Sequence, residues 1–174
     1  ELLAAASASQ LEVEIAAVGV SGMGPCVLLA DDADEPVRPA ILYGVDTRAT
    51  AQIDRMTDEL GVAEITRVGG STLTTQAGGP KIVWIADEEP AAYAAARRLF
   101  MPASWLARHL TGAYVLDHQS ASQVSPLYDV EREEWHADNW ARYAPGIEAP
   151  RLLWAGDIAG QVTDAAAAAT GLPA

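Results

Sequence analysis

The chain has 174 residues, enough for one domain with a sizeable core; half of the residues are hydrophobic and a fifth are charged, as in soluble globular proteins. Its formal net charge of −13 argues against nucleic-acid backbones and anionic membranes as partners, because like charges repel. The simplest role of this acidity is solubility.

The first part of the chain predicts two or three short strands of an α/β sheet. Its apolar runs cover residues 15–20, 26–30 and 40–43, and they lack the polar alternation of half-exposed strands. In open α/β sheets, ligands bind where strands end. Polar and flexible residues follow the first and third runs, as expected for a site that binds a small polar ligand. The candidates are Met23, Gly24, Pro25, Tyr43, Asp46 and Arg48.

The rest of the chain predicts mostly helices. Residues 1–9 look like the end of a helix, followed by a loop over residues 11–14. Helical spacing indicates a helix over residues 47–60, with its apolar face formed by Ala51, Ile53, Met56 and Leu60 and its end at Gly61. The stretch 65–79 is rich in Thr and Gly and predicts a loop, in which one short helical turn remains open.

Prolines mark the next helix starts, since a proline at the first helical position sacrifices no hydrogen bond. Helices are expected to begin at Pro80, Pro90 and Pro102, the second reaching Phe100 and the third ending before Gly112. The third should bury Trp105, Leu106, His109 and Leu110. The chain then predicts a strand over residues 113–116, a helix or turn over 117–124, a helix over 139–143 capped by Asp138, and a final helix over 165–170 that is capped by Thr163 or Asp164 and closed by Gly171.

Several kinds of site are not supported by the sequence. A single cysteine, Cys26, excludes an internal disulfide and fits a reducing, cytoplasmic setting. The three histidines lack metal-ligand spacing, so we expect no protein-ligated metal. Asp117, His118 and Ser120 lie too close in sequence for a hydrolase triad. No signal peptide is evident, and the longest uncharged run, residues 15–30, is too short and too broken to span a membrane.

Nucleotide-binding motifs are also missing. Gly78-Gly79-Pro80-Lys81 is not the phosphate-binding G-x-x-x-x-G-K-[ST] loop. The glycines of residues 19–24 do not have the order of a dinucleotide-binding G-x-G-x-x-G, and Pro25 blocks the helix that should follow. A dehydrogenase-type domain is therefore disfavoured.

An ordered series of short motifs does point to a family. Ser21-Gly22 and Met23 follow the first run, and Asp46-x-Arg48 follows the third. Further pieces of the series are residues 27–31 (VLLAD), 38–43 (RPAILY), 79–84 (GPKIVW), 89–90, 110–112, 117–122 and 170–173. In this order they resemble the FGGY carbohydrate kinases, most closely the xylulokinase-like branch. The resemblance implies a ribonuclease-H/actin-like α/β fold and transfer of the γ-phosphate of ATP to a sugar hydroxyl.

The resemblance also implies which residues touch the sugar. Pro25 stands where the family usually has the His of a Met-His pair, which suggests a ketose or polyol other than xylulose. Tyr43 stands near a family Trp that packs on the sugar. Asp46 and Arg48 match the family's Asp-x-Arg, and their side chains can accept from and donate to hydroxyls. Lys81 of the Pro-Lys-x-x-Trp piece is interpreted as a structural or cleft-lining residue, and residues 117–122 as support near the sugar.

Structural interpretations of the same residues remain open. Gly24 and Pro25 can form only a tight turn, and Tyr43 can be a core aromatic residue, in which case Gly44 matches the family Trp. A local ion pair of Asp46 with Arg48 is slightly favoured over a sugar contact, since such pairs are common in loops.

The parts of a kinase that the sequence lacks limit the prediction. The family's Asp-x-Gly-Thr segment for ATP phosphates and its catalytic Asp have no match in residues 1–174. We therefore expect a partial N-terminal domain, no catalytic residue within the chain, and ATP and Mg²⁺ bound elsewhere in a longer sugar kinase that can form a homodimer. The alternative is a non-catalytic carbohydrate-binding or interaction module.

Overall fold

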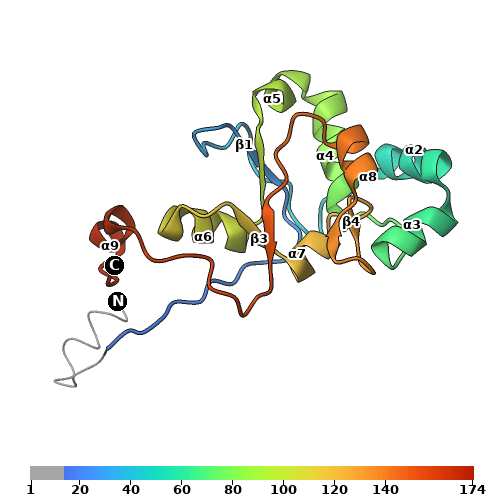
Figure 1. Ribbon diagram of the computed structural model, residues 1–174. Coiled ribbons are helices and arrows are strands. Elements are labelled where there is room, and N and C mark those ends of the chain that lie inside the picture. The colour runs from blue at the N-terminus through green and yellow to red at the C-terminus, as the bar shows by residue number, and fades with distance from the viewer. Residues whose placement is uncertain (1–13) are drawn as a thin grey trace.

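The computed structural model describes residues 14–174 (Figure 1). The predicted helix end over residues 1–9, and the predicted loop up to residue 13, lie outside the described residues. Short strands and helices alternate along the chain, in the order β1 (Leu28–Ala30), α2 (Thr50–Leu60), α3 (Val62–Gly69), α4 (Gly78–Glu88), α5 (Pro90–Ala95), β2 (Arg98–Phe100), α6 (Pro102–Thr111), β3 (Val115–Asp117), α7 (His118–Ser122), β4 (Tyr128–Asp129), β5 (Glu134–Trp135), α8 (Ala137–Tyr143), β6 (Arg151–Leu153) and α9 (Asp164–Thr170).

The described strands form pairs. β1 is antiparallel to β2 with Leu29 opposite Leu99, β3 is parallel to β6, and β4 is antiparallel to β5. A single bridge from Arg98 to Glu148 ties β2 to the segment before β6. The mixture of helices with parallel and antiparallel strands agrees with the expected α/β class.

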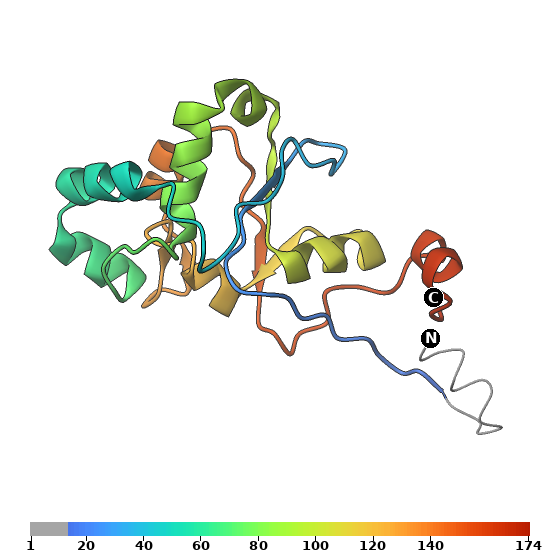
Figure 2. The same cartoon turned by 180° about the vertical axis from the view of Figure 1, so that it is seen from behind.

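The hydrophobic core lies around α4 and the β1–β2 pair. α4 contacts α2, α5 and α8, and both views place it in the middle of the larger group of helices (Figures 1 and 2). Removing the apolar side chains of this core from water is the main source of the stability of the fold. The fully buried residues of the core include Val27, Leu29, Ile41, Met56, Ile65, Ile82, Ile85, Leu99, Leu116, Val124 and Leu127.

Of the three apolar runs that predicted two or three strands, only the middle one forms a strand. Residues 15–20 are mostly exposed and carry no secondary structure, because no described residue offers their backbone a hydrogen-bond ladder. The third run forms only one bridge, in which Ile41 and Val27 exchange two backbone hydrogen bonds of 2.9 Å. The middle run is confirmed, as β1.

The helices differ from the predictions mainly at their edges. α2 begins at Thr50 and buries Met56 as expected, but it buries Gln52 and leaves Ala51 exposed. Gly61 ends α2 with a φ of 81°. The chain then re-enters a helix, α3, where a loop with at most one short helical turn was predicted from residue 65. Ile65 and Val68, three residues apart, face the core together.

The proline signals were correct at two helix starts and two residues late at the remaining one. Pro90 and Pro102 open α5 and α6, whereas α4 begins two residues before Pro80. α5 ends at Ala95 and not at Phe100, because residues 98–100 pair with β1.

Later elements show similar differences. α6 buries Ser104 and Ala107 rather than the predicted face. α8 is capped by His136 and not by Asp138. α9 is capped by Thr163 and ends at Gly171, as predicted.

Candidate functional site

The predicted site residues on two separate segments come together through the bridge between Val27 and Ile41. Just beyond it, the backbone N–H of Tyr43 donates to Cys26 Sγ at 3.3 Å. The ring of Tyr43 lies over Gly24, where an added Cβ would meet the ring carbons at 3.4 Å. Gly24 and Tyr43 are therefore neighbours, as the prediction requires.

Met23 and Pro25 flank this contact differently. Met23 is 66% exposed, whereas Pro25 is buried. The backbone N–H of Cys26 donates to Gly24 O at 2.6 Å, which closes a tight turn around Pro25. The turn interpretation of Gly24 and Pro25 thus describes their observed geometry, with Met23 facing solvent.

Gln76 joins the site although the sequence did not point to it. The hydroxyl of Tyr43 donates to Gln76 Oε1 at 3.3 Å, and both side chains reach the surface. Gln76 lies in the Thr- and Gly-rich stretch before α4, where no pattern singles out one residue. The pair supplies a hydroxyl and an amide at the same point of the surface, and both groups can exchange hydrogen bonds with a hydroxylated ligand.

Asp46 and Arg48 form the ion pair that their spacing favours. Arg48 Nε lies 2.8 and 2.9 Å from the two carboxylate oxygens of Asp46, and Arg48 Nη2 lies 2.6 Å from Oδ2. The backbone N–H of Arg48 also donates to Asp46 Oδ1 at 3.1 Å. The Arg48 hydrogen bonds lower the pKa of Asp46 against the opposing effect of burial, so this carboxylate is ionised at neutral pH.

α4 supports the loop that carries this pair. Lys81 is 1% exposed, and its Nζ donates to the carbonyl of Leu42 at 3.0 Å. Burial lowers the pKa of Lys81, while the negative charge of Asp46 opposes that change. The guanidinium carbon of Arg48 lies 4.6 Å from the ring centroid of Trp84, close enough for a cation–π contact. The predicted structural or cleft-lining position of Lys81 agrees with its burial under this loop.

Asp117, His118 and Ser120 form a second polar cluster, and their contacts stabilise local structure. Asp117 caps α7, accepting from the N–H of Ser120 at 2.9 Å and from its hydroxyl at 2.6 Å. His118 Nδ1 lies 2.8 Å from the hydroxyl of Tyr128. Asp117, His118 and Ser120 thus each have a partner nearby, and their arrangement is not a catalytic triad.

Two negative findings concern residues 14–174. Within them, no group of three or more His, Cys, Asp or Glu side chains is arranged to hold a metal ion, so we assign no Mg²⁺ ligand there. The same residues include no helix with the length and apolar character needed to cross a membrane.

Comparison with known proteins decides the family. Residues 3–174 match the N-terminal domain of the FGGY family of carbohydrate kinases. The chain belongs to this family.

Individual FGGY proteins are similar over nearly the whole chain. A xylulose kinase of Streptomyces coelicolor is 32% identical over 87% of the chain, and a glycerol kinase of Nocardia farcinica is 34% identical over 94% of it. The crystal structure of xylulose kinase from Rhodospirillum rubrum superposes with a TM-score of 0.88 at 28% identity, over 98% of the chain. This likeness confirms the expected ribonuclease-H/actin-like fold.

The chain matches only a part of each of these FGGY proteins. It spans 31% of the Streptomyces kinase, 34% of the Nocardia kinase and 35% of the solved Rhodospirillum chain. The chain thus corresponds to about a third of these proteins.

Proposed function

We propose that the protein containing this chain is an ATP-dependent kinase that phosphorylates a hydroxyl of a sugar, either a ketose or a polyol. The observation that carries the proposal is the FGGY match over residues 3–174, together with relatives that are xylulose and glycerol kinases. Residues 1–174 are then a partial N-terminal domain whose role is to bind the sugar.

The sugar would lie against the turn at residues 23–25 and the loop that carries Asp46 and Arg48. Met23, Gly24 and Pro25 would form one side, and the ring of Tyr43 would pack on the apolar face of the sugar. Asp46 would accept hydrogen bonds from sugar hydroxyls through carboxylate lone pairs that Arg48 leaves free, while Arg48 would donate to sugar oxygens. Gln76, bonded to Tyr43, extends the same polar surface.

The phosphoryl-transfer groups belong outside these residues in this proposal. Phosphoryl transfer needs a metal-bound nucleotide and a carboxylate near the acceptor hydroxyl. Residues 14–174 provide no metal cluster, so ATP and Mg²⁺ would be held by other parts of the protein, and no catalytic residue is assigned here.

The wider setting follows from the same proposal. The partner is a small neutral sugar, in a protein that acts in the cytoplasm and can form a homodimer. A net charge of −13 disfavours nucleic acid and anionic membranes as partners. The alternative, a non-catalytic carbohydrate-binding module, would use the same surface without phosphoryl transfer.

The test is ATP turnover by the full-length protein that contains this chain, measured as ADP release with a panel of pentuloses, polyols and glycerol. We expect turnover with at least one ketose or polyol. Sugar binding by calorimetry without ADP release would support the binding module instead, and neither binding nor turnover would refute both.

An Asp46→Asn variant tests the assigned surface. It keeps the size of the side chain but removes its charge, so kcat/KM for the sugar should fall about 10- to 100-fold, the loss expected for one charged hydrogen bond, with the KM for ATP unchanged. Asp54→Asn is the matched control, because Asp54 is exposed on α2. Equal kinetics of the two variants would remove Asp46 from the sugar site.

A further inference from the structure

Lys81 and Trp84 lie on one face of α4, beneath the loop formed by residues 42–48. Residues three apart on a helix point the same way. Lys81 contacts the start of the loop, at the carbonyl of Leu42, and Trp84 contacts its end, at Arg48. One turn of helix therefore holds both ends of the loop that presents Asp46.

A buried lysine at position 81 is energetically unfavourable. It is the only lysine of the chain, it is 1% exposed, and its Nζ has one hydrogen bond among the described residues. Burying an ammonium group costs free energy unless partners compensate. A methionine would fill similar space without that cost. What the ammonium adds is a donor to the loop backbone and a positive charge close to Asp46.

Trp84 orients the guanidinium of Arg48. The ring lies 4.6 Å from Arg48 Cζ, and Arg38 Cζ lies 5.9 Å from the same ring. Arg38 is in turn held by Glu89, with Nε 2.5 Å from Oε2. Arg48 is thus restrained by the carboxylate of Asp46 and by the face of Trp84.

Tyr43 holds the start of the loop through Cys26 and Gln76, but residues 44–47 have few other restraints. Gly44 has a φ of 79°, Val45 is exposed, and the only backbone hydrogen bond within the turn runs from Val45 N to Tyr43 O at 2.9 Å. A loop of this kind samples several conformations unless packing selects one.

We propose that Lys81 and Trp84 are positioning residues that fix the loop over residues 42–48, so that Asp46 and Arg48 hold a single orientation toward the sugar. The inference rests on the proposed sugar kinase function. It gives the Lys-x-x-Trp spacing a physical purpose: two different contacts, one helical turn apart, reach the two ends of one loop.

Steady-state kinetics of the full-length protein test the proposal. Trp84→Leu should raise the KM for the sugar about tenfold, the fold-change that corresponds to a well-formed cation–π contact, and leave the KM for ATP unchanged. Trp84→Phe keeps an aromatic face and should stay within about twofold of wild type. Lys81→Met should also raise the sugar KM, because it leaves the Leu42 carbonyl without its donor. Val62→Ala, at an exposed position at the start of α3, is the control and should change neither KM.

A double-mutant cycle separates positioning from a general loss of structure. If Trp84 acts through Arg48, Trp84→Leu should add less than about twofold to the sugar KM of Arg48→Gln, since the contact is already gone. A tenfold effect that persists in the Arg48→Gln protein, or no effect of Trp84→Leu at all, would overturn the proposal while leaving the kinase function intact.

The inference can also be tested if no sugar is turned over. A lack of sugar turnover would count against the proposed function but not against the positioning role. The Nε–Hε signal of Arg48 in an arginine-labelled NMR spectrum then reports its restraint directly. We expect a distinct, rigid signal in wild type and Trp84→Phe that shifts and becomes mobile in Trp84→Leu. A signal that is the same in all three proteins would overturn the positioning role.

Discussion

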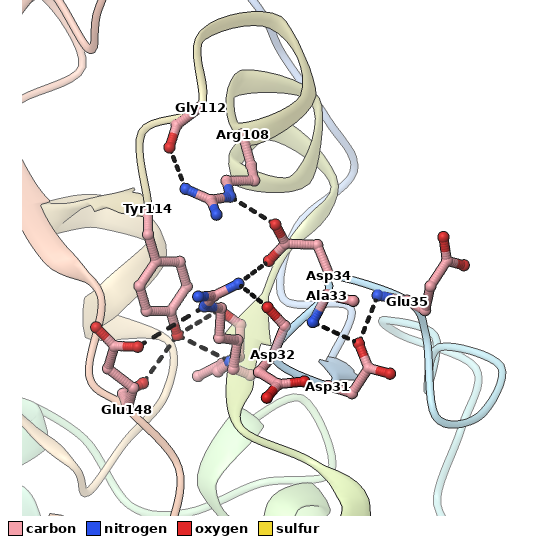
Figure 3. Close-up of polar contacts among 11 residues, drawn as sticks. Asp31, Asp32, Ala33, Asp34, Glu35, Arg108, Gly112, Tyr114 and Glu148 are labelled. Atoms are coloured by element: carbon pink, nitrogen blue, oxygen red, sulfur yellow. Dashed lines mark hydrogen bonds and ion pairs between the residues drawn. The ribbon is translucent and has the colours of Figure 1, made fainter.

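Asp34 is the clearest single anchor of the acidic turn that follows β1, and replacing it should loosen that turn measurably. Its carboxylate lies 2.5 Å from Arg98 Nη1 and 2.7 Å from Arg108 Nε, which joins the turn to β2 and to α6 (Figure 3). Arg98 also donates to the carbonyl of Asp32 at 3.0 Å. The residue has a φ of 67°, a conformation that Asp and Asn tolerate better than most residues.

The magnitude follows from these contacts. A hydrogen bond to a charged group contributes about 1.5–3 kcal/mol, and Asp34 makes two. The side chain of Asp34 is 14% exposed and those of its two arginines about a fifth, so water can solvate part of what is left behind. For Asp34→Asn, which keeps the size and backbone tolerance of the residue, we expect the local free energy of opening to fall by about 2–3 kcal/mol.

Hydrogen exchange of the full-length protein measures this loss where it occurs. Amides of β1, β2 and residues 31–37 should exchange about 30- to 150-fold faster in Asp34→Asn, while those of α8 remain unchanged. Asp32→Asn is the matched control: Asp32 is exposed and contributes only its carbonyl to the network, so its exchange should stay within about threefold of wild type. Equal exchange in the two variants would refute the assignment of the anchor to Asp34.

Acid should have the same effect as the substitution. Burial opposes ionisation of Asp34, but hydrogen bonds from Arg108 and Arg98 outweigh it and lower its pKa. A carboxylate with a lowered folded-state pKa contributes stability that is present above the unfolded value, near 3.9, and is lost as pH falls through the folded value. The difference between wild type and Asp34→Asn should therefore disappear in strong acid, and a constant difference down to the lowest pH would contradict an ionic anchor.

Two further predictions concern stability. Gly79→Ala should lower the free energy of unfolding by about 2–4 kcal/mol, because an added Cβ would lie 2.5 Å from the carbonyl oxygen of Ser125 in the buried start of α4. Gly19→Ala is the control, since an added Cβ there would meet nothing within 4 Å. Equal urea midpoints of the two variants would contradict the overpacking. Burial raises the pKa of Tyr93 to about 12, so its protonated form is favoured by the fold and its contribution should be lost between about pH 10 and 12. Urea unfolding should show that decline in wild type and a smaller one in Tyr93→Phe, and identical pH slopes would refute the assignment.

Local signals allowed several helix ends to be predicted. Pro90, Pro102 and the pair of Thr163 and Gly171 act through their own backbone chemistry, which needs no distant partner. Strands were harder to predict than helix ends, because a strand pairs with residues that are distant in the sequence. Residues 98–100 were assigned to a helix, yet they pair with β1, whose sequence lies almost 70 positions earlier. Residues 15–20 have a strand composition, but no strand forms without a ladder partner.

In the candidate site, too, contacts between residues close in sequence could be predicted and contacts between distant residues could not. The Asp46–Arg48 pair could be predicted because its two members are two residues apart. Gln76 could not, since its contact with Tyr43 spans 33 residues and the Thr- and Gly-rich stretch around it has no clear period. Trp84 entered the sequence analysis only as part of the Pro-Lys-x-x-Trp piece. Its contact with a guanidinium was invisible to periodicity, which reports burial but not the chemistry of the neighbour.

The contacts beneath the loop explain why weak motifs became specific as a series. Asp-x-Arg occurs often in loops, and Lys-x-x-Trp is an ordinary helical spacing. In this fold the second motif lies under the first: Arg48 lies beside Trp84, and the carbonyl of Leu42 accepts from Lys81. Each motif therefore restricts which residues can serve at the other. Substitutions in the two motifs should be non-additive for that reason, and the double-mutant cycle of Trp84 with Arg48 is the direct measure of this coupling.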